Sequence, residues 1–250
     1  DSPIQVPDGI NNIVAAVPYY CPTGVFTPDE SYITRVRMQS NDISIEPCRF
    51  MMPGVNTGDA AFAAVQAPSL KQYEMNIPNA SAVNVNIYAQ SMVANTAAVF
   101  GGCELIYSTG STGSQQYWNT PDAVSTGGTT IDTRTTLNTI TITEGRQITS
   151  LGMVVTPTTA AASTHDVGEA EFASSDFQVP FPYKFPIAPS FSGLGAAAQQ
   201  STNPNGLSQQ RYPAGDGIPI APRCLVNSFY TNRDAKGAGS TVMPFLSFTR

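Results

Sequence analysis

The sequence predicts an all-β protein made of two tandem antiparallel β-sandwiches, each with one short inserted helix. Apolar and polar residues alternate through most segments, most clearly in Val83–Tyr88 and Leu137–Ile142. Alternation with a period of two residues is typical of strands that have one buried face. β-branched and aromatic residues fill these runs, and Gly, Pro, Asn and Asp separate them. The remaining observation is that the whole pattern occurs twice.

Two short motifs carry the repeat. Ser40–Ile43 matches Ser174–Phe177 at an offset of 134 residues, and Pro47–Phe50 matches Pro182–Phe185 at an offset of 135. Five further pairs keep the same order: Ile4–Val6 with Ile140–Ile142, Asp8–Gly9 with Glu144–Gly145, Ile13–Pro22 with Ile148–Pro157, Val85–Tyr88 with Asn227–Tyr230, and Leu105–Ser108 with Leu246–Thr249. The offsets run only from 134 to 142. Such self-similarity indicates a repeated structural unit; two β-regions that share only ordinary alternation are the alternative.

Each half also contains one alanine-rich stretch at the same relative place. These stretches are Asp59–Gln66 and Leu194–Gln200. Alanine has the highest helix propensity, and the Asp59 side chain can accept hydrogen bonds from the first turn of a helix. We therefore expect one short helix in each half, followed by a pair of strands.

The repeat divides the chain into two sandwich domains and a linker. Residues 1–110 and 131–250 are each expected to hold about seven strands, and residues 111–130 form a linker rich in Gly, Ser and Thr. The linker contains Trp118, the only tryptophan, beside Tyr117. This pair either docks on a sandwich edge or contacts a partner, and docking is favoured. The longest loop is expected at Gln199–Gly217.

The chain is poor in charge. Charged residues make up 12% of it, and Lys71, Lys184 and Lys236 are the only lysines, whereas Lys and Glu normally cover the surface of a monomer. Such a surface suits either a protein packed against copies of itself or a secreted β-domain. The formal net charge of -6 and the lack of a basic run argue against direct binding of nucleic acid, which needs clustered Lys and Arg.

The four cysteines are Cys21, Cys48, Cys103 and Cys224, and none is in Cys-x-x-Cys spacing, so a zinc or redox motif is not expected. They allow either two disulfides, in three connectivities, or buried free thiols. No apolar run approaches the roughly 20 residues needed to span a bilayer, and no segment has the pattern of a signal peptide. The first residue is Asp1 rather than Met, which implies processing or an incomplete start.

No catalytic, cofactor-binding or metal-binding residue is predicted. The only histidine, His165, stands in the polar segment Ser163–Asp166, which is expected to be an exposed turn, and no Gly-x-Ser-x-Gly motif accompanies it. Glu169 and Glu171 alternate on one face of an expected strand, an arrangement that can serve acid–base chemistry or bind a cation. No phosphate-binding glycine loop is present. Asn79–Ser81 is a glycosylation sequon, a triplet that is common by chance.

Arg35 and Arg37 occupy the positions in the first half that Glu169 and Glu171 occupy in the second, at an offset of 134. One hypothesis is that these faces of opposite charge meet across an interface, where each exposed pair contributes only about 0–1 kcal/mol and sets register more than strength. Reversing both arginines to Glu would then block assembly. The alternative is that both are solvated strand faces.

Asp42 and Asp176 also recur at equivalent places. Each follows a Ser-Asn or Ser-Ser pair, so each is expected to make a local turn hydrogen bond at a strand junction. A calcium site would need an Asp-x-Asp-x-Asp-Gly loop, which the sequence lacks.

The architecture resembles the double jelly-roll major capsid proteins, a family that includes adenovirus hexon and the capsid proteins of membrane-containing bacterial and archaeal viruses. The resemblance covers nearly the whole chain and rests on the two Ser-x-Asp motifs, the two Pro-x-x-Phe motifs, the alanine-rich stretches and the terminal strand pairs. It implies that both sandwiches are jelly-roll-like, although seven strands per half is one fewer than the eight of a jelly roll.

The resemblance also implies how the protein functions. Three copies would form a homotrimer whose six jelly rolls give a pseudo-hexagonal block, and these blocks would tile an icosahedral shell in the virion. Minor capsid or penton proteins and an internal lipid membrane are the partners implied. Neither a cofactor nor direct contact with nucleic acid is implied.

Three functions stay open on the sequence. A self-assembling major capsid protein is the leading hypothesis. A secreted tandem-sandwich hydrolase that acts on glycans would need a carboxylate-lined cleft with aromatic platforms, and the scarcity of His, Trp and clustered acids argues against it. A non-viral extracellular tube or filament subunit shares every bulk feature with the capsid protein, and only the geometry of assembly separates the two.

Overall fold

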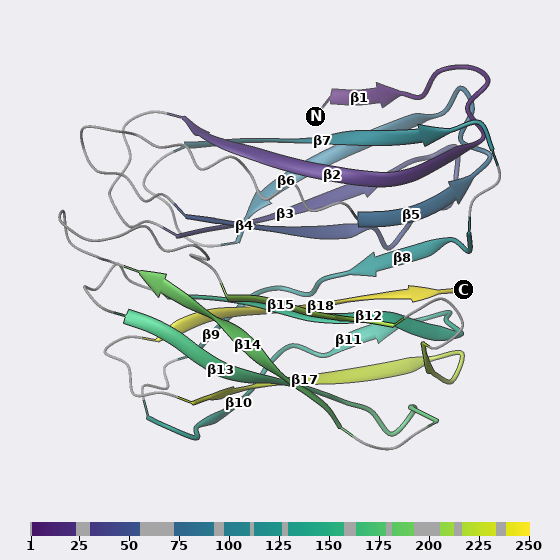
Figure 1. The fold of residues 1–250 in the computed structure, drawn as a ribbon. Helices are drawn as coiled ribbons and strands as arrows, with labels where there is room; N and C mark the ends of the chain where they lie inside the picture. The colour runs from purple at the N-terminus through teal and green to yellow at the C-terminus, as the bar shows by residue number, and fades with distance from the viewer. Residues whose placement is uncertain are drawn as a thin grey trace.

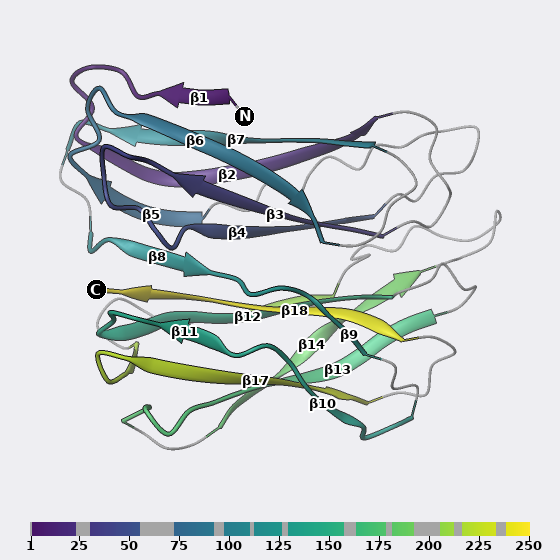
Figure 2. The same cartoon turned by 180° about the vertical axis from the view of Figure 1, so that it is seen from behind.

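The computed structural model of the chain describes residues 2–23, 31–55, 73–92, 98–110, 113–126, 130–157, 164–178, 182–192, 206–212, 217–233 and 239–250. These residues form an all-β protein in which antiparallel strands make two sandwich-like sets, one above the other in Figures 1 and 2. The predicted fold class is therefore confirmed. The helices expected at Asp59–Gln66 and Leu194–Gln200 lie outside the described residues.

The strands follow the alternating runs of the sequence. The first half contains β1 (Ser2–Gln5), β2 (Asn12–Thr23), β3 (Ser31–Gln39), β4 (Arg49–Val55), β5 (Tyr73–Pro78), β6 (Asn84–Ser91) and β7 (Ala98–Ser108). The connecting segment forms β8 (Gln116–Asn119) and β9 (Val124–Thr126). The second half contains β10 (Arg134–Thr136), β11 (Ile140–Ile142), β12 (Gln147–Pro157), β13 (Thr164–Ala173), β14 (Tyr183–Ser192), β15 (Gly206–Arg211), β16 (Ile218–Pro219), β17 (Cys224–Asn232) and β18 (Ser240–Thr249).

The two halves have the same strand order. In the first half, one sheet runs β1-β6-β3-β4 and the facing sheet runs β5-β2-β7. In the second half, one sheet runs β10-β17-β13-β14, with β11 also on β17. Its facing sheet runs β15-β12-β18-β8, with β16 also on β12 and β9 also on β18. Each strand of the first half therefore has a counterpart in the second, and β18, the counterpart of β7, pairs in addition with β8 and β9.

Local irregularities recur along with the strand order. The ladder between β2 and β7 shifts register between Ile13 and Ala15, and the ladder between β12 and β18 shifts between Ile148 and Ser150, an offset of 135. Directly beside each shift the neighbouring strand contributes an Ile-Pro pair, Ile77-Pro78 in β5 and Ile218-Pro219 in β16. Bulges are specific features of a strand pair rather than defects, so their recurrence supports a repeated unit.

The register corrects one of the sequence matches. Tyr88 lies opposite Arg37, whereas Phe229 lies opposite Glu171, so Tyr88 is equivalent to Phe229. Their offset of 141 also relates Val85, opposite Ile4, to Val226, opposite Ile140. The expected match of Val85–Tyr88 with Asn227–Tyr230, at 142, is therefore wrong by one residue. Such a slip would place every side chain on the opposite face of the sheet.

The connecting segment is part of the second sandwich and also closes the first. Strands β8 and β9 both pair with β18, with Asn119 of β8 opposite Leu246 and Val124 of β9 opposite Val242. Strand β8 also lies against β4 and β5, which are edge strands of the two first-half sheets. Figures 1 and 2 show β8 running between the halves. The segment thus covers the open flank of the first sandwich, and the expected loop at Gln199–Gly217 likewise contains a strand, β15.

Adjacent residues of β8 enter different cores. Trp118 packs in the core of the first half, edge-on to Tyr73 at 4.8 Å between ring centroids. Tyr117 packs in the core of the second half, stacked on Phe248 at 5.6 Å. The Trp118 indole N–H donates to the Glu74 carbonyl at 2.7 Å, which satisfies the one polar group of this ring. The prediction that this aromatic pair docks on a sandwich is confirmed.

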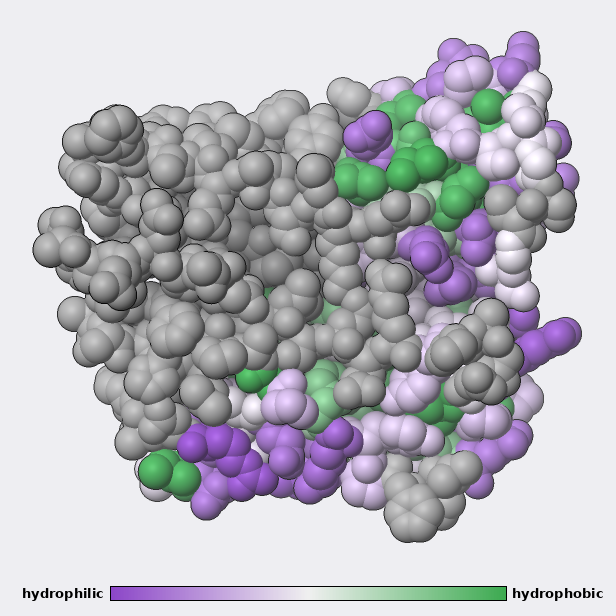
Figure 3. Space-filling view, viewed as in Figure 1, coloured by the Kyte–Doolittle hydropathy of each residue, from purple (hydrophilic) through white to green (hydrophobic). Residues whose placement is uncertain are grey.

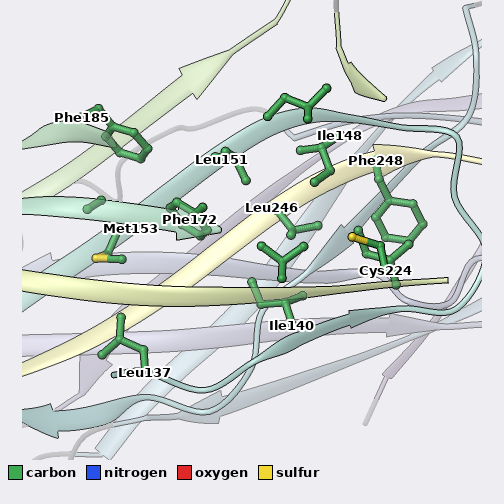
Figure 4. Close-up of a cluster of buried hydrophobic side chains, with 14 of the residues drawn as sticks. Leu137, Ile140, Ile148, Leu151, Met153, Phe172, Phe185, Cys224, Leu246 and Phe248 are labelled. Carbon is green, nitrogen blue, oxygen red and sulfur yellow. The ribbon is translucent and has the colours of Figure 1, made fainter. Parts of the chain in front are cut away.

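We call the contact between the two halves the seam. The second-half sheet that faces it, β15-β12-β18-β8, is buried on both sides. One side forms the core shown in Figure 4, with Leu151, Leu246 and Phe248 among its residues. The other side adds Phe245 and neighbouring apolar residues to the first-half core. β18 is buried along its whole length. Because of this shared layer, the two halves make one continuous packed unit.

Candidate functional site

The two Ser-x-Asp motifs make the same pair of hydrogen bonds, one in each half. The Ser40 hydroxyl accepts from the Asp42 backbone N–H at 3.1 Å, and Ser174 does so for Asp176 at 3.0 Å. The Asp42 carboxylate then accepts from the Asn84 N–H at 2.9 Å, at the start of β6. The Asp176 carboxylate accepts from the N–H of residue 225, in β17, at 3.1 Å. The serine hydroxyl thus makes the local turn bond, and the aspartate carboxylate ties the turn after β3 to β6 and the turn after β13 to β17.

In the second half, a row of charges crosses the outer face of the sheet β10-β17-β13-β14. Glu171 lies opposite Lys184 on β14 and opposite Phe229 on β17. Arg134 donates two hydrogen bonds to the Glu171 carboxylate, at 2.9 and 3.2 Å, and its guanidinium covers the Phe229 ring at 3.5 Å. Hydrogen bonding by Arg134 is the main cause that lowers the pKa of Glu171. We call Glu171 and its partners Arg134, Lys184 and Phe229 the acidic row.

Further ion pairs surround the acidic row. Glu169 contacts Lys184 at 3.7 Å and Arg233 at 3.3 Å, and Arg233 also contacts Asp132 at 2.5 Å. Figure 3 shows hydrophilic side chains gathered over β10 and β13. Positive and negative charges alternate here, so the surface is close to neutral.

The equivalent row of the first half is positive. Arg37 lies opposite Arg49 on β4 and opposite Tyr88 on β6, and Arg35 lies opposite Gln90. Arginine therefore faces arginine where the second half places glutamate opposite lysine. We call Arg35, Arg37 and Arg49 the basic row.

Carboxylates inside the chain neutralise only part of the basic row. Arg35 pairs with Asp122 at 2.8 Å and donates to Gln90, also at 2.8 Å. Arg37 pairs with Glu46 at 2.6 Å. The hypothesis that the arginine and glutamate faces meet each other is not realised within the chain, because each face finds other partners.

Two cavities open over the basic row. A cleft of about 650 Å³ lies between the halves and is lined by Arg35, Arg37, Arg49, Tyr88, Gln90, Pro121, Asp122, Asn138 and Thr139. A second cavity of about 330 Å³ shares Arg37 and Arg49 and adds Arg250, whose guanidinium donates to the Glu46 carbonyl at 2.9 Å. The basic row thus lines a cleft between the two halves.

The residues considered for catalysis are not assembled into a site among the described residues. His165 belongs to β13 and pairs with Phe191 of β14, so the expected turn is wrong: the ladder of β13 extends past it. Ser163 lies outside the described residues. No group of three His, Cys, Asp or Glu side chains suited to a metal ion occurs in the described part of the chain. Within that part, no helix is long and apolar enough to cross a membrane.

Three of the four cysteines are buried free thiols, namely Cys48, Cys103 and Cys224. Burial raises the pKa of Cys103 to about 12 and also raises the pKa values of Cys48 and Cys224. These thiols are therefore protonated and unreactive near neutral pH. The side chain of Cys21 is outside the described part.

Comparisons with known proteins identify no family. No family model and no curated protein matches the chain. Among solved structures, the major capsid protein P2 from bacteriophage PM2 is 12% identical, with a TM-score of 0.34 over 99% of this chain and 91% of that one. A chain of Broad Bean Stain Virus is 8% identical, with a TM-score of 0.38 over 95% of this chain and 77% of that one.

A chain of infectious bursal disease virus, Gx strain, is 11% identical with a TM-score of 0.30. The alignment covers 96% of this chain and 58% of the viral one, so this chain spans less than two thirds of the length of that protein. A function for this chain must therefore be argued from its own architecture and surface.

Proposed function

We propose that the chain is a structural protein, a major capsid protein that assembles as trimers of pseudo-hexagonal outline into an icosahedral viral shell. The observation that carries this proposal is the corresponding strand order of two sandwiches joined by a shared buried layer. Two similar lobes fixed in one rigid block give six similar lobes when three copies surround a threefold axis. Closed symmetric assembly of this kind is the usual way in which identical chains form large structures.

An open sheet edge supports self-assembly. In the second half, the outer edge of β18 is covered by β8 and β9. The equivalent strand in the first half, β7, pairs with β2 on one side and has no strand on its other side among the described residues. An open edge of eleven residues presents unpaired backbone groups and is a template for pairing with another chain.

The charge composition supports a shell that does not itself hold the genome. Only 12% of residues are charged and the formal net charge is -6, so the electrostatic attraction that binding of nucleic acid requires is weak. We extend the proposal to location in the virion and to contacts with minor capsid or penton proteins. The proposal also includes a lipid membrane beneath the shell.

Electron microscopy and analytical ultracentrifugation of the purified chain test this function. At rising protein concentration we expect trimers, seen from above as six-lobed blocks, followed by closed shells. Open tubes or filaments would favour an extracellular filament subunit instead. A chain that stays monomeric at all concentrations and salt conditions would overturn the structural role.

A further inference from the structure

The basic row has one more positive charge than the nearby carboxylates can neutralise. Arg35 is neutralised by Asp122 and Arg37 by Glu46. Among the described residues, the Arg49 guanidinium has neither an ion pair nor a hydrogen-bond acceptor. Three guanidinium groups and two carboxylates leave a single net positive charge, and it is located at Arg49.

The strand register holds this charge in an unfavourable place. Arg49 lies directly opposite Arg37, and like charges directly opposite each other on a sheet destabilise the pair. Burial, then the charges of Arg35 and Arg37, lower the pKa of Arg49, and the charges of Glu46 and Asp122 offset part of this effect. Arginine nevertheless remains protonated in proteins, so a bound negative group would relieve the repulsion that remains.

The cleft over Arg49 can admit such a group. It measures about 650 Å³ and opens between the two halves. Besides the arginines it presents the Tyr88 phenol and the Gln90 and Asn138 amides, all of which can donate hydrogen bonds. Arginine presents its donors in a planar fork that matches the two oxygens of a phosphate or carboxylate.

We propose that this cleft binds an oxyanion, a phosphate or carboxylate group, with Arg49 as its main charge partner. The group would either come free from solution or be the carboxylate of an Asp or Glu side chain on a second copy of the chain. The equivalent position in the second half needs no such ligand, because Lys184 there lies opposite Glu171. The inference does not depend on the proposed capsid role.

Calorimetric titration with inorganic phosphate, at fixed ionic strength in sodium chloride, tests the free-ion source. We expect the wild type to bind about one phosphate per chain, and Arg49→Gln to bind it at least about tenfold more weakly, since a hydrogen bond to a charged group contributes about 1.5–3 kcal/mol. Arg223→Gln is the matched control, because Arg223 lies in an exposed turn before β17 and lines neither cavity. It should bind phosphate as the wild type does.

Sedimentation velocity of the same proteins, in chloride and in phosphate, tests the second source. If a neighbouring copy supplies the carboxylate, Arg49→Gln self-associates less than Arg223→Gln, and phosphate weakens self-association of the wild type. Melting curves establish that Arg49→Gln folds; were it not to fold, Arg49→Lys keeps the charge, loses the fork and should bind more weakly. The inference would be overturned if wild type and Arg49→Gln bound phosphate equally and also self-associated equally.

Discussion

The strands that end the two halves differ at one equivalent position, Glu104 in β7 and Phe245 in β18. Both face away from the core of their own sandwich. Glu104 is exposed, whereas Phe245 is 1% exposed and packs near Trp118 at 6.3 Å between ring centroids. The same scaffold position is thus charged where it meets solvent and aromatic where the second half covers the flank of the first.

The partner position across the ladder differs in a matching way. Glu104 lies opposite Val17 and Phe245 lies opposite Gly152. A Cβ atom added to Gly152 would lie 2.1 Å from Cζ of Phe245, so the glycine makes room for the ring. The lesson is that the repeat fixes the backbone, while paired side-chain changes decide which face becomes an interior seam. The basic and acidic rows show the same principle on the opposite sheets.

Phe245→Glu gives the second half the residue of the first and has the largest expected effect. It would place a carboxylate in a fully buried apolar layer, and we expect a loss of about 4 kcal/mol or more in the free energy of unfolding. Urea denaturation measures it. Glu104→Gln, at the equivalent exposed position, should change stability by less than about 0.5 kcal/mol. Similar effects for the two substitutions would mean that the seam is not buried.

Gly152→Ala tests the space that the seam requires. The new methyl group forces the Phe245 ring out of its position, and overpacking of this kind costs about 1–3 kcal/mol. Thermal unfolding monitored by circular dichroism measures the loss. Combining the substitution with Phe245→Ala should remove the clash, so a double variant that loses the full sum of both single effects would contradict the proposed contact.

Glu171→Gln tests the acidic row. The substitution removes the charge that holds Arg134, and we expect a loss of about 1 kcal/mol, small because Arg134 is half exposed and the pair is screened by solvent. The pH dependence gives a second readout. The folded-state pKa of Glu171 lies below its ordinary value of 4.5. Its contribution is therefore complete above about pH 4.5 and is lost as the pH falls through the lowered pKa.

Wild-type stability should accordingly fall more steeply below pH 4.5 than that of Glu171→Gln. Arg223→Gln, which changes an exposed arginine in the turn before β17, is the control and should leave this acid limb unaltered. Identical acid limbs for wild type and Glu171→Gln would show that the acidic row contributes nothing to the pH dependence.

Arg49→Gln has the smallest expected effect on stability and the opposite sign. In chloride buffer it removes a like-charge pair on the sheet, so we expect a gain of about 0.2–1 kcal/mol. Guanidinium chloride is a salt and would screen the interactions between charges. Urea denaturation at low ionic strength is therefore the suitable measurement. A clear loss of stability would mean that Arg49 has a favourable partner.

Much of the fold could be predicted from the sequence, because alternation and two short motifs each occur twice. The Ser-x-Asp and Pro-x-x-Phe motifs lie at equivalent places in the two halves, at the junction of β3 with β4 and of β13 with β14. The match in β6 and β17 slipped by one residue because Tyr88 was aligned by identity with Tyr230, whereas the true register is set by pairing with β3 and β13. Alternation would normally reveal a one-residue slip, but β17 does not alternate cleanly, because the polar Ser228 is buried and the aromatic Phe229 beside it lies on the outer face.

The seam and the basic row depend on contacts between distant segments. The apolar run Val242–Leu246 does not alternate, which is the sign of a strand buried on both faces, and this signal could have located the seam. Arg49 was missed because only the strand register places it opposite Arg37. Leu137–Ile142 was expected to be one strand, yet only Ile140–Ile142 is a strand within it, because both Asn138 and Thr139 face solvent.

The single tryptophan tests most directly whether the two halves are one packed unit. Trp118 lies at the seam and is 2% exposed, so its fluorescence reports the seam, while far-ultraviolet circular dichroism reports the strands of both halves. In urea we expect both signals to change in one coincident transition, from a blue-shifted emission that indicates a buried indole. Fluorescence that shifts at a lower urea concentration than the circular dichroism signal would show that the halves separate before they unfold, and would contradict the shared layer.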